Sequence, residues 1–241
     1  MNKIISLLSL TIIMTLFGCK TSPEEGKNNS ETANKIAEHT KMYKTFYDLG
    51  DDQSCVYTLQ KILSLDSSKN EYYDSLVFHY AKAGNINATE KMIAKSLQYG
   101  KNVKVMEYSA LISEQKGDAE TAISKLVELF NMTNDYKYKV STFSMNLERG
   151  DVKSASNILT ELENLENLDS ISIDQIVSET ETQKVPLEAA VILGKAQIEA
   201  YAKNNLSGAM NYIKKALEIK PDFQNALALR DNILQATQRR R

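Results

Sequence analysis

The chain has 241 residues, of which 42% are apolar, 29 are basic and 31 are acidic, and its formal net charge is −2. This balance lacks the basic excess that binding to a phosphate backbone requires, and it argues against a nucleic-acid partner. Only nine glycines and three prolines are present. Their scarcity disfavours sheets joined by tight turns and favours long helices with few breaks.

The first 18 residues have the features of an export signal. Lys3 supplies a positive charge, and residues 4–17 are mostly apolar. As a helix this apolar stretch would span about 21 Å, less than the roughly 30 Å hydrocarbon core of a bilayer. A cleaved signal peptide is therefore favoured over a transmembrane anchor, and the loss of Lys3 would leave a net charge of −3.

Residues 16–19, Leu-Phe-Gly-Cys, resemble the lipobox of bacterial lipoproteins. In that family, cleavage leaves an acylated cysteine, so the resemblance implies that Cys19 carries palmitate and related acyl chains. Several acyl chains anchor a protein stably in a membrane. The alternative is an ordinary secreted protein in which Cys19 has no role.

The residues after Cys19 bear on location. Lys20 stands where many inner-membrane lipoproteins carry Asp, so the resemblance implies a periplasm-facing lipoprotein of the bacterial outer membrane. The acidic pair at 24–25 keeps export to the cell surface open. Residues 19–33 contain no large apolar side chain, and we expect them to form a flexible tether that holds the next helix about 20 Å from the membrane.

From residue 34 onward the sequence repeats. A glycine followed by Asp or Asn recurs at intervals of 34, 33 and 33 residues, in Gly50-Asp51, Gly84-Asn85, Gly117-Asp118 and Gly150-Asp151. A fifth unit appears where Asn204 takes the place of the glycine, since Asn also tolerates the left-handed conformation at a helix end. A period of this length indicates stacked two-helix repeats.

The residues after each turn are patterned for burial. The fifth position is always small, as in Cys55, Thr89, Ala122, Ala155 and Ala209. Apolar residues follow nine, twelve and thirteen positions after most turns, which is one face of a helix. Cys55 is thus expected to fill a helix crossing, and the mature chain cannot form an internal disulfide between Cys55 and the acylated Cys19.

These features together resemble tetratricopeptide repeats, with Pro221 ending the last unit. The resemblance implies an all-α fold, a right-handed superhelical solenoid over residues 34–241 with a cap helix at 222–238 on its open end. The aromatic residue that the family carries before each turn is present only at Tyr73.

One segment interrupts the pattern. About 20 extra residues separate Gly150 from Asn204, and residues 154–183 contain no Lys or Arg. Within this acidic insertion, at about 164–185, the Ser-Ile-Asp-Gln of residues 172–175 predicts a short helix to about Glu179. Pro186 would then start an elongated first helix. The insertion either adjusts the angle between repeats or offers an acidic contact to a basic or Ca²⁺-loaded partner, although it lacks the spacing of an EF-hand.

In the family, ligands lie in the groove formed by the first helices, and the resemblance places a set of residues there. They are Lys44, Tyr47, Asp74, Phe78, Lys104, Glu107, Leu111, Glu114, Lys137, Ser144, Leu147, Ile198 and Tyr201. Such a mixture of charges and apolar anchors suits an extended peptide or a helix. The carboxylate clamp of chaperone-binding members is not expected, because only Lys104 matches it.

No catalytic or metal-binding motif is apparent, so neither an enzyme nor a cofactor is expected. His39 and His79 have no metal-ligand spacing, and no phosphate loop or nucleophile elbow is present. The favoured function is a scaffold that binds a protein or peptide partner in the cell envelope. The alternatives are a surface-exposed binding subunit for nutrient or glycan capture and a homo-oligomeric spacer.

Overall fold

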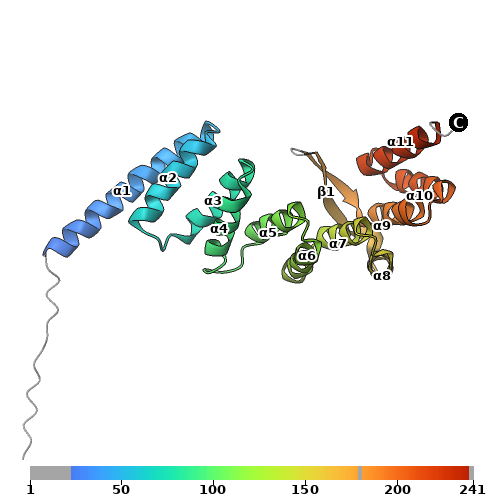
Figure 1. Cartoon of the computed structure of the whole chain (residues 1–241), viewed down its shortest axis with the longest axis horizontal. Helices are drawn as coiled ribbons and strands as arrows, with labels where there is room; N and C mark the ends of the chain where they lie inside the picture. Colours follow the sequence, from blue (N-terminus) through green and yellow to red (C-terminus); the bar gives the residue numbers. More distant parts are fainter. Residues whose placement is uncertain (1–22, 179–180, 239–241) are drawn as a thin grey trace, which may run out of the picture. The chain divides into compact units, whose positions relative to one another are not determined.

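The computed structural model describes residues 23–178 and 181–238 (Figure 1). The predicted signal peptide and Cys19 lie outside this part of the chain. Within it, no helix is both long enough and apolar enough to cross a membrane.

The described residues are mostly helical, and the chain divides into two compact units at Ser68 and Lys69. The first unit contains α1 (Pro23–Asp48) and α2 (Asp52–Leu65). The second contains α3 (Asn70–Lys82), α4 (Ile86–Ser96), α5 (Val103–Gln115), α6 (Ala119–Thr133), α7 (Lys137–Glu148), α8 (Val152–Glu163), η1 (Leu168–Ser170), β1 (Ser172–Ser178), β2 (Glu181–Pro186), α9 (Leu187–Gln197), η2 (Ile198–Ala202), α10 (Leu206–Ile219) and α11 (Gln224–Gln238).

Consecutive helices pack in pairs, α1 with α2, α3 with α4, α5 with α6, α7 with α8, and α9 with α10. These pairs are the five predicted repeats, and the all-α fold class is confirmed. Neighbouring pairs of the second unit also pack on each other through α4 and α5, α6 and α7, and α8 and α9, so their apolar faces are buried along the stack.

Each of the five turns has the predicted left-handed residue. The φ angles are 70° at Gly50, 67° at Gly84, 76° at Gly117, 81° at Gly150 and 50° at Asn204. Side chains rarely adopt this conformation, which explains why glycine or asparagine occupies the position.

The residue after the left-handed one ends one helix and begins the next. In the third repeat, the backbone N–H of Asp118 donates to the carbonyl of Ser113 at 2.9 Å, which closes the end of α5. The carboxylate of Asp118 accepts from the N–H of Thr121 at 3.1 Å and caps α6. One residue thus satisfies groups at two helix ends, with its backbone N–H at the end of α5 and its carboxylate at the start of α6, which fixes the angle of the hairpin.

The small side chains five positions after each turn are fully buried, as the sequence predicts. Cys55, Thr89, Ala122, Ala155 and Ala209 each have 0% exposure. The apolar residues nine positions after each turn are buried as well: Leu59, Ile93, Leu126, Leu159 and Ile213. A larger side chain at the fifth position would push the paired helices apart.

The first helix begins earlier than the composition suggests. The helix α1 starts at Pro23, so residues 23–33 are helical and the prediction of a flexible tether is wrong for this stretch. Proline is favoured at the first position of a helix. One turn of α1 is further supported by an ion pair between Glu31 and Lys35 at 2.7 Å. Local helix signals therefore outweigh the lack of apolar residues.

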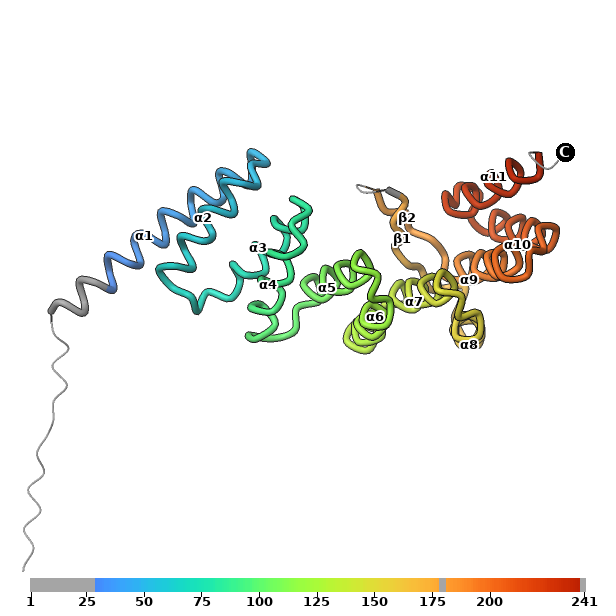
Figure 2. Tube along the Cα trace, viewed as in Figure 1, coloured from blue at the N-terminus to red at the C-terminus, as the bar shows by residue number. Residues whose placement is uncertain are grey.

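The acidic insertion forms a β-hairpin, and the predicted helix from Ser172 is wrong. Strands β1 and β2 pair antiparallel, with Ile173 opposite Val185 and Ile176 opposite Thr182. The strands leave the helical stack between α8 and α9 (Figure 2). The capping-box pattern at 172–175 is only a local signal, whereas pairing with β2 satisfies the backbone of β1 over its length.

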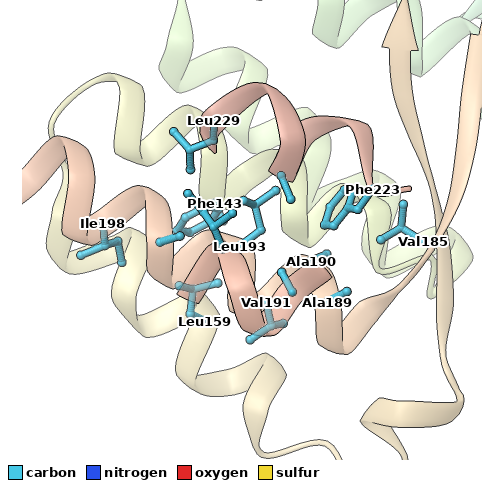
Figure 3. Close-up of a cluster of buried hydrophobic side chains, with 14 of the residues drawn as sticks. Phe143, Leu159, Val185, Ala189, Ala190, Val191, Leu193, Ile198, Phe223 and Leu229 are labelled. Carbon is cyan, nitrogen blue, oxygen red and sulfur yellow. The ribbon is translucent and has the colours of Figure 1, made fainter. Parts of the chain in front are cut away.

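The hairpin is part of the largest core cluster, not only a solvated insertion. Ile173 and Val185 have 2% and 0% exposure and pack with residues of α7 to α11 (Figure 3). Burial of these two side chains pins the base of both strands to the helices.

The first helix of the fifth repeat is elongated, as predicted, and Pro186 is its N-cap. It continues from α9 through the π-turn η2, where the N–H of Lys203 donates to the carbonyl of Ile198 at 3.1 Å. The predicted cap helix is α11, and Phe223 at its start has 0% exposure.

Candidate functional site

A groove of about 690 Å³ lies between α5, α7, β1 and the N-terminal end of α11. Its lining residues are Lys104, Glu107, Tyr108, Ala110, Leu111, Glu114, Leu126, Leu129, Lys137, Tyr138, Val140, Ser141, Ser144, Met145, Glu148, Ile173, Asp174, Gln175, Ile176, Thr182 and Asn225. The first helices of the third and fourth repeats form one wall, and the inserted hairpin forms the opposite wall.

The predicted residues on α5 all line this groove. Lys104, Glu107, Leu111 and Glu114 are spaced by three or four residues, so they share one face of the helix. From α7, the structure adds the predicted Lys137 and Ser144. These six predicted residues thus lie along one wall of the groove, whereas the predicted Leu147 does not line it and packs against the core cluster.

The middle of this wall holds a charged network between two repeats. Lys137 Nζ lies 3.0 Å from Glu107 Oε1, and the phenol of Tyr138 donates to the same carboxylate at 2.7 Å. Burial by itself would lower the pKa of Lys137, but the hydrogen bond and charge of Glu107 outweigh it and raise that pKa. Glu107 and Lys137 thus neutralise each other and join α5 to α7.

The same carboxylate affects the tyrosine. Burial, and then the hydrogen bond and charge of Glu107, raise the pKa of Tyr138 to about 12. Tyr138 therefore stays a neutral hydrogen-bond donor at any physiological pH. The raised pKa reports a structural pair and gives no sign of an acid–base role.

The remaining charges of the groove are mostly acidic. Glu114, Glu148 and Asp174 enter no ion pair with any residue in the described part of the chain, and neither does Lys104. Three carboxylates against one ammonium leave the groove with an excess of negative charge.

Two apolar side chains provide anchors on opposite walls. Leu111 on α5 is 43% exposed, and Ile176 on β1 is 75% exposed. Single exposed apolar side chains are common on protein surfaces, but these two border the same groove, so both can contact one occupant.

The hairpin is fixed to the end of the stack by side-chain amides. The Gln183 amide donates to the carbonyl of Asp222 at 2.7 Å and accepts from the N–H of Gln224 at 3.1 Å. The Asn225 amide donates to Gln175 Oε1 at 3.1 Å. These bonds hold both strands against the start of α11, so the groove has a fixed second wall.

Two predicted groove residues on α3 have structural contacts instead. Asp74 accepts hydrogen bonds from Ser96 and from the amide of Asn102, the latter at 2.7 Å. Asn102 is also the N-cap of α5, so Asp74 holds that cap in place. Phe78 packs edge-on against His79 at 5.0 Å between ring centroids. Neither Asp74 nor Phe78 lines the groove.

The predicted residues at the two ends of the chain lie elsewhere. In the first unit, Lys44 and Tyr47 line a separate small hollow on α1. In the fifth repeat, Ile198 is only 8% exposed and belongs to the core cluster, so its prediction as a groove residue is wrong. Tyr201 is 65% exposed but does not line the groove. The π-turn at 198–202 rotates these side chains away from the repeat register.

The acidic stretch at 154–183 was expected to offer carboxylates to a partner, and two of them, both on α8, are already neutralised. Glu161 pairs with Lys139, and Glu163 pairs with Lys195. Within residues 23–178 and 181–238, no group of three or more His, Cys, Asp or Glu side chains is placed to bind a metal ion.

The groove residues of the hairpin were missed by sequence reasoning. The repeat pattern carries no information on an insertion, and the alternation of Ile171, Ile173 and Gln175 is too short to identify a strand on its own. Such residues could have been found only through the β-branched content of residues 171–177, which favours a strand over a helix.

No protein-family model and no curated protein matches the sequence. Among solved structures, the protein YrrB, described as a TPR protein with an unusual peptide-binding site, aligns with a TM-score of 0.57 at 17% identity, over 86% of this chain and 95% of that one. The MamA protein aligns with a TM-score of 0.59 at 13% identity, over 78% and 93%.

A third structure, PilF of Pseudomonas aeruginosa, aligns with a TM-score of 0.53 at 14% identity, over 87% of each chain. At these identities the likeness concerns the fold. The chain therefore has the tetratricopeptide-repeat fold, as shown by these alignments together with the five left-handed turns and the buried small residues.

Proposed function

We propose that this chain is a membrane-anchored scaffold that binds a protein partner of the cell envelope through a peptide segment in the groove between α5, α7 and β1. The observation that carries the proposal is the groove itself, whose walls hold exposed apolar anchors and charges that form no ion pair with other described residues. A volume of this size is typical of a binding site.

Several features favour a peptide over a compact small molecule. The groove is lined along three turns of α5 and α7, from Lys104 to Glu114 and from Lys137 to Glu148. Both walls carry charged side chains near their ends and apolar side chains between them, a mixture that suits an extended or helical segment. The similar structure of YrrB is described as having a peptide-binding site, and this supports the same class of ligand here.

The membrane anchor is proposed from the sequence. The segment 16–19 and the apolar stretch before it support acylation of Cys19, and Lys20 supports the outer membrane. Metabolic labelling with an alkyne fatty acid tests the anchor. We expect Cys19→Ser to lose the label and to leave the membrane fraction, and retention of both would refute lipid anchoring at this residue.

The groove is tested by in-cell crosslinking followed by affinity capture and mass spectrometry. The groove variant is the double substitution Leu111→Asp and Ile176→Asp. Its matched control is Val127→Asp with Leu234→Asp, because those two residues are each 46% exposed and do not line the groove. All four side chains are exposed, so neither double variant should unfold the chain.

We expect one specific envelope protein to be captured by the wild type and the control and lost, by tenfold or more, from the groove variant. Equal capture by all three proteins would refute the groove as the binding surface. Recovery of only the chain itself would favour the spacer hypothesis.

A further inference from the structure

The outer edge of β1 is an unpaired strand edge. The sheet has only the strands β1 and β2 in the described part of the chain, so one edge of each strand has no neighbour. Backbone N–H and C=O groups at such an edge can pair with another extended chain.

The hydrogen-bond pattern identifies which groups face outward. The N–H of Leu187 donates to the carbonyl of Ile171 at 2.8 Å, so this pair bonds across the hairpin. Hydrogen-bonded and non-bonded pairs alternate in an antiparallel ladder. With the observed register, Ile173 and Gln175 face β2, whereas Asp174 and Ile176 direct their N–H and C=O groups away from it.

The position of Pro186 agrees with this assignment. It lies opposite Ser172 in a pair that makes no cross-strand bond, where the missing N–H of proline costs no hydrogen bond. The backbone groups of Asp174 and Ile176 make no hydrogen bond to the backbone of described residues outside the two strands.

This outer edge borders the groove. Four consecutive residues of β1, 173–176, line it, whereas β2 contributes only Thr182. Side chains of consecutive strand residues point to opposite faces, so a consecutive lining run means that the groove runs along the strand edge itself. The same strand contacts α7, whose residues form the other wall.

The charges of the groove select the occupant. Glu114, Glu148 and Asp174 enter no ion pair with the described residues, and Lys104 is the one cation of the groove lining outside the pair of Lys137 and Glu107. Lys184 stands opposite Asp174 on β2 but does not line the groove. A segment with Lys or Arg at alternate positions would place its charges near these carboxylates and its other side chains near Leu111 and Ile176.

We propose that the groove takes a basic, extended peptide segment, which adds to β1 as a third strand and hydrogen-bonds to the backbone of Asp174 and Ile176. This inference rests on the proposed function and specifies its ligand. Backbone pairing gives affinity that depends little on sequence, and the carboxylates give preference for basic segments.

The probe is a capped octapeptide, (Lys-Val)4, with fluorescence anisotropy as the measurement on the full chain. We expect the peptide to bind in low salt and (Glu-Val)4 to bind at least tenfold more weakly. Two further probes carry backbone N-methyl groups, one at the Lys residues and one at the Val residues. Alternate residues of a strand face the same edge, so one methylated probe should lose about tenfold in affinity while the other loses little.

A variant of the strand edge provides the reciprocal test. Asp174→Pro removes both the carboxylate and the outward backbone N–H, a group that makes no bond to β2. Asp174→Asn removes the charge but keeps this N–H. We expect Asp174→Pro to weaken (Lys-Val)4 binding several-fold more than Asp174→Asn. The methylated probes use the unmodified chain, so they decide the question even where the proline disturbs the hairpin.

The outcomes separate this inference from the function on which it rests. Strand addition is overturned if (Lys-Val)4 does not bind, or if both methylated probes bind as tightly as the parent peptide. It is also overturned if the two Asp174 variants weaken binding equally. If the crosslinked envelope partner is still lost from the Leu111 and Ile176 double variant, the groove remains the binding site. If no groove variant affects capture, the proposed function itself fails.

Discussion

At the scale of single residues, the five turns divide their functions between two adjacent positions. The first position needs a left-handed backbone, which glycine or Asn204 supplies. The second needs a short acceptor, because its side chain caps the following helix in every repeat, through Asp51, Asn85, Asp118, Asp151 and Asn205. The recurrence of these two residue types follows from the geometry of one hairpin turn.

The aspartate caps predict a dependence of stability on pH. Hydrogen bonds from the side chain and the backbone of Thr121 lower the pKa of Asp118, and those from Ser154 lower the pKa of Asp151. A folded-state pKa below the unfolded value of about 3.9 gives a stabilisation that is present above that value. It is lost as the pH falls through the lower, folded-state pKa.

We expect Asp118→Asn with Asp151→Asn to flatten the loss of stability below about pH 4, since Asn caps a helix without titrating. Urea unfolding midpoints at pH 7, 4 and 3 measure the effect, with helicity followed by circular dichroism. Asn85 and Asn205 show that the turn accepts an amide. An unchanged acid dependence in the variant would show that other carboxylates dominate it.

The buried alanine at the crossing of α5 and α6 predicts a large steric effect. Ala122 has 0% exposure, so Ala122→Leu should force the two helices apart and reduce the free energy of unfolding by about 1 to 3 kcal/mol. Ala236 on α11 is exposed, and Ala236→Leu is the matched control with an expected change below about 0.5 kcal/mol. Urea denaturation compares them, and similar values for both would contradict tight packing at the crossing.

At the scale of elements, the hairpin is the feature that distinguishes this stack from a plain series of helix pairs. Its base is buried through Ile173 and Val185, while the Gln183 amide bonds to both sides of the turn before α11. An element that would be marginally stable alone is therefore stable on the helices. This attachment places the edge of β1 opposite α7.

Removal of the Gln183 amide should loosen the junction of the hairpin with α11. Gln183→Ala leaves the N–H of Gln224 and the carbonyl of Asp222 without these partners, and we expect a loss of about 1 kcal/mol in unfolding free energy. Hydrogen exchange at residues 223–227 should accelerate. Gln235→Ala, an exposed glutamine on the same helix, serves as the control, and equal exchange rates in the two variants would argue against the clamp.

At the scale of the whole chain, stability depends on contacts between neighbouring helix pairs and on the closure of the last one. The core cluster of the C-terminal repeats extends from Phe143 on α7 to Ile233 on α11, and Phe223 is fully buried in it. The helix α11 thus covers an apolar face of the fifth helix pair.

A chain ending at Asp222 should expose that face. We expect a lower urea midpoint and concentration-dependent self-association in light scattering, since the cluster loses Phe223, Ala226, Leu229 and Ile233. A chain ending at Gln238 keeps α11 and is the control. A monomeric truncated protein with the stability of the control would show that the helix does not act as a cap.

The sequence alone determined the repeat. The period of the turns, the small residues five positions later and the apolar stripe are local patterns, and each is enforced by the geometry of one hairpin. They predicted the five helix pairs, the left-handed Asn204, the cap helix and the α5 face with Lys104, Glu107, Leu111 and Glu114.

The tertiary structure decided the rest, because those features depend on contacts between residues distant in sequence. The strand at 172–178 exists through its pairing with β2 and the burial of Ile173, neither of which the capping-box pattern at 172–175 reveals. The π-turn moved Ile198 into the core. The second wall of the groove follows from the attachment of the hairpin to α11, a contact spanning about 40 residues that the repeat pattern does not encode.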